Sequence, residues 1–419
     1  MTPEVKERIE QIRHGIVPEG YKKTKVGIVP NDWHEDSLSK YLREFKKLSN
    51  DIDKYPVYSS SRQGLIPQSQ YYDKREAVET NLGYKVVPNE YVTYRHMSDD
   101  DIFHFNINET GGEILVSSEY PVFTASSKGE LGFIIPMLNG TARFRYFCRM
   151  QKMGGTRTRL YYKNLCVYKA AFPSLVEQKR IAEILSTQDK LITLKEKLIE
   201  EKKRQKKALM QQLLTGKKRL PGFGGEWKTQ KMSDVLCERN EVNKDQNLRI
   251  CSVAVNSGVV DQREHLGKSM AAADTSNYNV VCYGDIVYTK SPTGEFPFGI
   301  VKQSQLSENV AVSPLYGVYK PATYELGYLL NEYFMYSNNA NGYLLPIVNK
   351  GAKNTINISN TTFICPSLYL PTDFEEIKKL AQIFKTANRE IEILEKELIQ
   401  EKQKKKALMQ LLLTGIVRV

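Results

Sequence analysis

The sequence predicts a mixed α/β (α+β) protein in which two similar globular domains are separated by two long antiparallel coiled-coil helices with pseudo-two-fold symmetry. Three observations predict this fold class: an internal repeat, two long amphipathic segments, and two segments typical of short strands. The chain has 419 residues, of which 41% are hydrophobic and 26% charged, an ordinary globular balance. This length exceeds what one compact core usually holds, so two domains are expected.

The internal repeat is clearest in a lysine-rich segment that occurs twice. Residues 206–216 read KKALMQQLLTG and residues 405–415 read KKALMQLLLTG. Weaker matches link the segments that follow Trp33 and Trp227, so the two globular segments look like diverged copies. The chain therefore consists of two copies of one unit, with a fragment of the repeated helix at its start.

Two segments, 177–214 and 376–413, have the pattern of long helices. Apolar residues recur about every 3.5 positions among charged ones, and Gly and Pro are absent. A single apolar stripe does not hold a helix in water, so we expect the two copies to pack against each other. The alternative is that each helix only covers its own domain. The residues predicted at the coiled-coil or subunit interface are Ile181, Leu185, Ile192, Leu198, Leu209, Leu213, Leu380, Ile391, Leu394, Leu398, Leu408 and Leu412.

The segments between the helices have a different amino-acid composition. Short runs of Val, Ile, Tyr, Phe and Thr are separated by Gly, Pro and Asn, which is typical of short strands and turns with a few helices. We therefore divide the chain into a partial helical repeat (1–15), a first globular domain (16–172), a central helix (173–216), a second globular domain (217–370) and a C-terminal helix (371–419).

The charge balance favours a polyanionic partner. Lys and Arg exceed Asp and Glu by 60 to 48, although an inert basic surface is the alternative. No apolar run approaches the roughly 20 residues of a membrane span, and the charged N-terminus lacks the apolar core of a signal peptide. We therefore expect a cytoplasmic protein with no membrane partner. The six cysteines include no C-x-x-C pair, so we expect reduced packing residues.

Two stretches without acidic residues are the candidate nucleic-acid surfaces. Residues 131–176 interleave basic and aromatic side chains, whereas residues 333–372 contain seven Asn. Arg can contact phosphate or read guanine, and Asn can read adenine. A solvated basic face is the alternative for the first stretch. The candidate DNA contacts here are Arg143, Arg145, Lys152, Arg157, Arg159, Lys350, Lys353 and Asn354.

Two polar loops, 59–64 and 253–258, occupy matching places in the two copies. Both end in Gly and precede an apolar pair. Polar loops on a rigid scaffold are natural base readers, although both could be plain hairpin turns. The candidate DNA contacts in these loops are Ser60, Ser61, Arg62, Gln63, Asn256 and Ser257.

Motifs for catalysis are incomplete. Gly267-Lys268-Ser269 resembles the end of a phosphate-binding loop, but position 262 is Gln where the first Gly is needed. The five histidines have no metal-ligand spacing. Glu226-Trp227-Lys228 has the E-x-K spelling of many nucleases, so a self-contained nuclease stays as an alternative. Otherwise the sequence predicts neither a catalytic nor a metal site.

The order of these parts resembles the specificity subunit of a type I restriction-modification system. Two variable domains are each followed by a P-x(3)-E start, a long Lys/Glu-rich helix and a K-K-A-L-M-Q-x-L-L-T-G ending. The resemblance covers nearly the whole chain. It departs at the second helix start, where Glu376-Ile377 stands against Glu177-Gln178 in the first.

This resemblance implies a non-catalytic, DNA-binding subunit of a phage-defence complex. Each target recognition domain would read one half of a split site in double-stranded DNA. The helices would set the spacer and dock two modification subunits, which bind S-adenosylmethionine and methylate a flipped adenine. Up to two restriction subunits would bind ATP and Mg²⁺, and none of these cofactors would bind this chain. The alternative from another class is a structural coiled-coil scaffold with two protein-binding domains.

Overall fold

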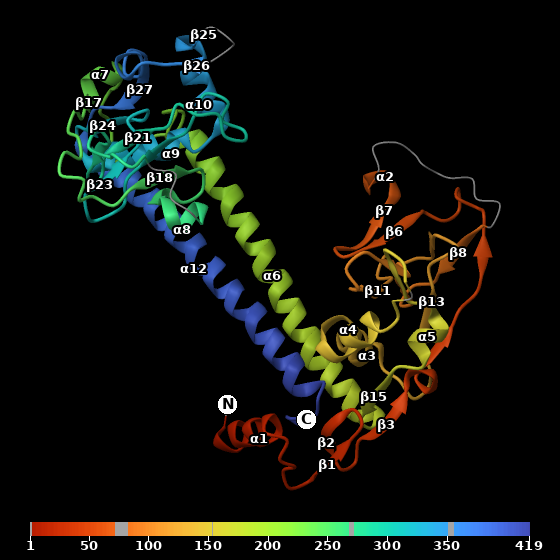
Figure 1. Ribbon diagram of the computed structural model, residues 1–419. Coiled ribbons are helices and arrows are strands. Elements are labelled where there is room, and N and C mark those ends of the chain that lie inside the picture. The colour runs from red at the N-terminus through yellow and green to blue at the C-terminus, as the bar shows by residue number, and fades with distance from the viewer. Residues whose placement is uncertain (1, 72–82, 153, 268–271, 351–355) are drawn as a thin grey trace. The chain divides into compact units, whose positions relative to one another are not determined.

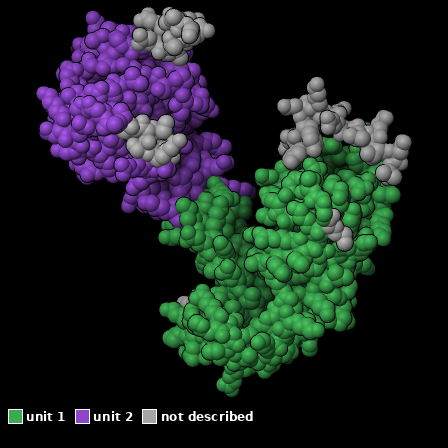
Figure 2. Space-filling model, viewed as in Figure 1, with its two compact units in different colours: residues 1–196, 397–419 green, residues 197–396 purple. Residues whose placement is uncertain are grey.

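The computed structural model describes residues 2–71, 83–152, 154–267, 272–350 and 356–419. They form two compact units, one of residues Met1–Glu196 with Glu397–Val419 and one of residues Lys197–Lys396 (Figure 2). Each unit contains one globular domain and parts of two 39-residue helices, α6 (Leu175–Leu213) and α12 (Phe374–Leu412) (Figure 1). The predicted mixed fold class, with two domains and two long helices, is confirmed.

The two helices run antiparallel within each unit, because residues early in α6 meet residues late in α12. Polar pairs join the helices at 2.5–2.7 Å; these are Gln188–Glu401 and Lys195–Glu397 in the first unit, and Lys202–Glu390 and Lys203–Glu395 in the second.

The buried apolar stripe of α6 follows the predicted positions except at Leu198 and Leu209. Leu198 and Leu209 are 42% and 37% exposed, whereas their neighbours Ile199 and Met210 are buried. A spacing of about 3.5 residues drifts against the 3.6-residue turn of a straight helix, so the predicted register is corrected by one residue here. The other predicted positions are buried (Ile181, Leu185, Ile192, Leu213, Leu380, Leu412) or half-buried (Ile391, Leu394, Leu398, Leu408).

The start of each long helix also packs into its own domain. Ile181 and Leu185 belong to the core of the first domain, and Leu380 and Phe384 to that of the second. Both interpretations of the amphipathic pattern therefore hold, each over a different part of the helix.

The first unit is built from short antiparallel strands with helices beside them (Figure 1). A four-stranded sheet has the order β11-β9-β13-β4 and a three-stranded sheet the order β12-β8-β5. Tyr94, Phe105 and Phe123 pack in its aromatic core. The elements are α1 (Pro3–Arg13), β1 (Tyr21–Thr24), β2 (Gly27–Pro30), β3 (His34–Ser37), η1 (Leu38–Lys40), β4 (Leu42–Glu44), β5 (Leu48–Ser49), β6 (Tyr58–Ser61), β7 (Gly64–Pro67), α2 (Gln68–Tyr71), β8 (Tyr84–Val87), β9 (Val92–Thr93), β10 (Met97–Ser98), β11 (Asn106–Ile107), β12 (Ile114–Val116), β13 (Val122–Ala125), α3 (Leu131–Gly140), α4 (Ala142–Arg149), β14 (Thr158–Arg159), α5 (Tyr162–Cys166) and β15 (Lys169–Phe172).

The second unit repeats this plan around a sheet of order β17-β24-β21-β22. Tyr288, Tyr319 and Phe363 stack in its core. The elements are β16 (Trp227–Lys231), α7 (Met232–Val235), β17 (Leu236–Glu238), β18 (Cys251–Ala254), β19 (Gly258–Asp261), α8 (Gln262–Leu266), β20 (Asn279–Val281), β21 (Ile286–Tyr288), β22 (Val301–Gln303), β23 (Val310–Val312), β24 (Gly317–Pro321), α9 (Tyr324–Phe334), α10 (Ser337–Leu344), η2 (Leu345–Ile347), β25 (Asn349–Lys350), β26 (Ile356–Asn357), α11 (Asn360–Phe363) and β27 (Ser367–Pro371).

One buried cluster ties the start of α6 to the first domain and to the segment after α12. The Glu177 carboxylate accepts hydrogen bonds from Trp33 Nε1 at 3.2 Å and from Arg418 Nε and Nη2 at 2.6 and 2.8 Å. Glu177 lies in the first turn of α6, where the helix dipole favours a negative charge. We call Trp33, Glu177 and Arg418 the first cluster.

The second unit contains the same arrangement at the start of α12. The Glu376 carboxylate accepts from Trp227 Nε1 at 3.1 Å and from Arg219 Nε and Nη2 at 2.8 and 2.7 Å. We call these three residues the second cluster. Arg219 and Arg418 each follow the glycine of the repeated L-L-T-G segment by three positions. The repeat therefore encodes an ion pair that connects the end of one long helix to the start of the other.

The described residues contain no helix that is both long and apolar enough to cross a bilayer. All six cysteines are free thiols.

Candidate nucleic-acid interface

The predicted polar loop of the first domain is the turn of a β-hairpin. Strands β6 and β7 pair with Ser61 opposite Gly64, and Gly64 has a φ of 115°, which favours glycine. The Ser61 hydroxyl donates to the Gly64 carbonyl at 2.9 Å and accepts from the Gln63 N–H at 3.1 Å. This turn leaves Arg62 and Gln63 exposed.

Ser60 is the least exposed of the predicted contacts in this loop. Its side chain is buried, and its hydroxyl accepts a hydrogen bond from Asn106 Nδ2 at 2.7 Å. It also lines a cavity of the first unit, so its contact with DNA stays a prediction.

An acidic loop, Asp99–Asp101, holds side chains from two of the predicted DNA-contacting segments. Asp99 Oδ1 accepts from Arg157 Nε at 2.7 Å, and Asp100 Oδ1 accepts from Arg62 Nη2 at 2.5 Å. The Arg62 guanidinium holds the pKa of Asp100 below its usual value. Asp101, which has a φ of 63°, accepts from the Thr158 hydroxyl. The three consecutive carboxylates thus bind two segments: Asp99 and Asp101 bind Arg157 and Thr158, which are adjacent, and Asp100 binds Arg62 of the hairpin turn.

Strand pairing brings these segments together. Strand β10 pairs with β14, so Met97 lies opposite Arg159 and Ser98 opposite Thr158. The basic segment around Arg157 is therefore placed beside the start of the acidic loop, although about 60 residues of sequence separate them, since only tertiary pairing closes such a distance.

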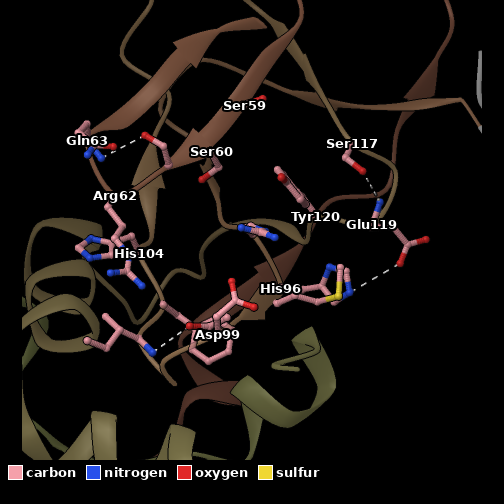
Figure 3. Close-up of a pocket in the computed structure, with 16 residues that line it drawn as sticks. Ser59, Ser60, Arg62, Gln63, His96, Asp99, His104, Ser117, Glu119 and Tyr120 are labelled. Carbon is pink, nitrogen blue, oxygen red and sulfur yellow. Dashed lines mark hydrogen bonds and ion pairs between the residues drawn. The ribbon is translucent and has the colours of Figure 1, made fainter. Parts of the chain in front are cut away.

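A polar cavity of about 530 Å³ lies between the hairpin turn and the acidic loop (Figure 3). Arg62 and Gln63 of the turn and Asp99 of the loop line it, together with several serines. This volume is in the range of small-molecule pockets, but its lining is mostly hydroxyl and charged groups. The cavity is therefore suited to a polar ligand group such as a base edge or a phosphate.

Two histidines line the same cavity. His96 is 3% exposed, and among the described residues its Nδ1 has no hydrogen-bond partner. Burial lowers the pKa of His96, and the charge of Arg159 lowers it further, against the opposing effect of Glu119. Burial also lowers the pKa of His104, followed by the charges of Arg62 and Arg145. Both imidazoles are therefore neutral at pH 7 and can donate or accept one hydrogen bond at each nitrogen.

Helix α4 presents a basic face beside the cavity. Phe144 and Cys148 are buried, whereas Arg143, Arg145 and Tyr146 are exposed. The Arg143 guanidinium donates to a backbone carbonyl at 3.3 Å. Its amphipathic pattern leaves this helix with one face for the core and one for a polyanion or for solvent. Lys152, just after the helix, is also exposed.

The hairpin β18–β19 of the second unit is the counterpart of β6–β7. Ala254 lies opposite Gly258, which has a φ of 72°, and the turn exposes Asn256 and Ser257. The two matching polar loops of the sequence are therefore both hairpin turns, and their exposed residues differ.

Part of the asparagine-rich stretch of the second unit is bonded inside the domain. Asn339 Nδ2 donates to the Tyr333 carbonyl at 3.0 Å, and Asn360 Nδ2 donates to Glu238 Oε1 at 2.6 Å. Contact of this stretch with adenine stays a prediction. Lys350 lies on β25, whereas Lys353 and Asn354 lie outside the described residues.

The E-x-K spelling lies at the start of β16 in this fold. Glu226 is exposed and lies 3.7 Å from Lys228, and Trp227 belongs to the second cluster. In the part of the chain that the structure describes, no group of three or more His, Cys, Asp or Glu side chains is placed to hold a metal ion.

Sequence reasoning missed the acidic loop and the arginines of the two clusters. The search for nucleic-acid surfaces looked for stretches without acid, and this criterion excluded Asp99–Asp101. Arg219 and Arg418 did carry a signal, since both follow the repeated glycine at the same spacing.

Comparison with known proteins finds a family model that matches part of the chain. Residues 42–204 match the family model of the type I restriction modification DNA specificity domain. This part of the chain is similar to the type I restriction-modification specificity subunits. The match covers most of the first domain, including the acidic loop, and the first part of α6.

A curated relative is consistent with this match. Over 216 residues the chain is 27% identical to the "Putative type I restriction enzyme MjaX specificity subunit" of Methanocaldococcus jannaschii, and the alignment covers 47% of this chain and 49% of the relative. The matched region thus spans about half the length of that relative.

Solved structures give the fold of the whole chain. The S subunit of a type I restriction-modification system from M. genitalium is 12% identical, with a TM-score of 0.55 over 91% of this chain and 96% of that one. The HsdS subunit from Thermoanaerobacter tengcongensis is 15% identical, with a TM-score of 0.47 over 93% and 98%. At such identity, the likeness to the first structure shows a shared fold.

Proposed function

We propose that this chain is a specificity subunit that reads a bipartite site in double-stranded DNA, with one half-site for each unit. The first unit would use Arg62, Gln63 and the arginines around the cavity, and the second would use the turn of β18–β19. The net charge of +12 supports a polyanionic partner.

The observation that carries this proposal is one plan repeated with different polar residues. Both units present a hairpin turn at the same place, with Arg62 and Gln63 in the first and Asn256 and Ser257 in the second. Arg is suited to guanine edges and Asn to adenine edges. A repeated scaffold with different turn residues is therefore suited to two different half-sites.

In this proposal the chain performs no chemistry itself. The helices α6 and α12 set the spacer between half-sites and dock two modification subunits. These subunits bind S-adenosylmethionine and methylate adenine, and up to two restriction subunits bind ATP and Mg²⁺. What the chain contributes is position: specific contacts fix which adenine reaches a partner's catalytic site.

The experiment that tests this proposal maps methylated adenines genome-wide in cells that co-express the chain with its modification subunit. We expect a split motif with two defined halves around an unspecified spacer. Cells with the modification subunit alone are the control and should lack the motif. An intact, cofactor-bound complex that methylates no defined motif would contradict the proposal and favour a protein-binding scaffold.

A further inference from the structure

Carboxylates stand where the first unit is expected to meet a polyanion. The Asp99–Asp101 loop borders the cavity formed with the hairpin turn, and it holds two arginines of the basic surface. Carboxylates near phosphate oppose binding because like charges repel. These carboxylates therefore weaken the sequence-independent binding of DNA phosphates. A role in selecting one DNA sequence over others would account for their presence.

These ion pairs are too exposed to contribute much to stability. The side chains of Arg62 and Asp100 are 54% and 44% exposed, and those of Arg157 and Asp99 are 50% and 65% exposed. Exposed pairs are screened by water and salt and stabilise a fold only slightly. A purely structural role therefore leaves the geometry unexplained.

We propose that Asp99 and Asp100 are specificity-determining residues of the first unit, which position Arg157 and Arg62 for guanine edges and make contact with non-specific DNA unfavourable. This inference rests on the proposed function of DNA reading. Arg157 is held through Nε, which leaves both Nη groups as a fork for guanine O6 and N7, and Arg62 is held through one Nη only. A fixed guanidinium loses less freedom on binding.

The histidine in the cavity is a second, independent observation that points to a ligand here. His96 is buried and lines the cavity with Asp99 and Arg62, and its Nδ1 lacks a partner among the described residues. Buried polar groups are nearly always hydrogen-bonded, so an unpaired nitrogen in the cavity that Arg62 and Asp99 also line indicates a polar group that arrives with the partner.

The test uses the full chain in complex with its modification subunit and the variants Asp99→Asn and Asp100→Asn. If a released arginine contacts phosphate, the plot of log K against log salt for non-specific duplex steepens by about 0.9 for each variant. The control Asp53→Asn removes an exposed carboxylate of the same unit that forms no ion pair among the described residues, and it should leave this slope unchanged.

The second readout is the methylated motif. We expect Asp99→Asn to relax one base pair of one half-site by about five- to 150-fold, the range of a single bidentate contact, and to leave the other half unchanged. Arg157→Ala should relax the same position, and adding Asp99→Asn to Arg157→Ala should have no further effect. Asp99→Glu keeps the charge but moves the carboxylate, so it should retain the salt slope and still alter this position.

Three results would overturn the inference. In the first, Asp99→Asn and Asp100→Asn keep the salt slope and the methylated motif of the wild type. In the second, they change the slope and the motif no more than Asp53→Asn does. In the third, the effects of Asp99→Asn and Arg157→Ala on the motif add up in the double variant. In each case the wild-type complex still yields a split motif. A wild-type complex without a split motif would instead overturn the proposed function.

Discussion

The two units attach their domains to the long helices through different contacts. In the first unit, α3 packs closely against the long helices because it carries glycine at the contact. A Cβ on Gly132 would lie 2.6 Å from the Cβ of Ala182, and one on Gly140 would lie 2.3 Å from Met409 Cε. In the second unit the contact is polar. Glu332 of α9 is buried and pairs with Lys206 of α6 at 2.7 Å.

Other partners extend the polar contact of the second unit. Asn388 of α12 donates to Glu332 Oε1 at 2.9 Å and to the Tyr328 hydroxyl at 2.7 Å, and Lys385 Nζ lies 4.3 Å from the ring centroid of Tyr324. The Trp–Glu–Arg clusters recur in both units, as does the apolar packing of each helix start into its own domain. The comparison shows that the clusters form the common framework, while each domain packs against the helices with its own chemistry.

Removing the glutamate of either cluster has the largest expected effect on this comparison. Glu177→Ala and Glu376→Ala should each lower the free energy of unfolding by about 3 kcal/mol, the low end for a broken buried ion pair, because both arginines can still reach water. Urea unfolding measures this loss. Similar losses for the two variants support a common framework, and a loss confined to one variant would contradict it.

The glycine contact is specific to the first unit. Gly132→Val should lower the free energy of unfolding by about 2 kcal/mol through overpacking against Ala182. The control is Gly342→Val in α10 of the second unit, where a Cβ would meet no atom within 4 Å. It should raise the free energy of unfolding by about 0.3 kcal/mol, because Val has a higher helix propensity than Gly. Thermal unfolding of both variants checks this difference. Equal losses would mean that close approach at Gly132 is unimportant.

The polar contact should be sensitive to pH through Lys302. This side chain is 4% exposed, and burial lowers its pKa from 10.5 to about 8, against the opposing charge of Glu332. Between pH 8 and 10.5 the unfolded state binds more protons than the folded state, so stability rises with pH in this window.

Lys302→Met should remove this rise and should stabilise the chain at pH 7 by about 1 kcal/mol, because no buried ammonium has to be desolvated. Urea unfolding at pH 7 and 9.5 is the measurement, with the wild type as control. A variant that is less stable at pH 7 would show that Glu332 compensates the Lys302 charge well, and a variant that keeps the rise would show that another group causes it.

The parts that sequence could predict are those with a long or repeated signal. The helices α6 and α12 follow from periodicity, and the hairpin turns at Arg62 and Asn256 follow from the internal match. The pairing of Arg219 with Glu376 links positions 157 residues apart, so the repeat marks Arg219 but does not identify its partner. The burial of Ser60 and its bond to Asn106 could not be predicted, because polarity alone does not tell a buried, bonded hydroxyl from an exposed one.

The acidic loop shows a further limit of sequence reasoning. A surface for DNA was sought as an absence of acid, but Asp99 and Asp100 join this surface through the pairing of β10 with β14. Their role depends on the orientation of two guanidinium groups, which only the folded chain defines.

Independent reading of two half-sites by the two units is tested most directly by a pair of matched variants. Arg157→Ala and Asn256→Ala, each co-expressed with the modification subunit, should yield methylation maps in which different halves of one split motif are relaxed and the spacer is unchanged. The account predicts one altered half for each variant. Loss of the same half in both, or of both halves in either, would contradict it.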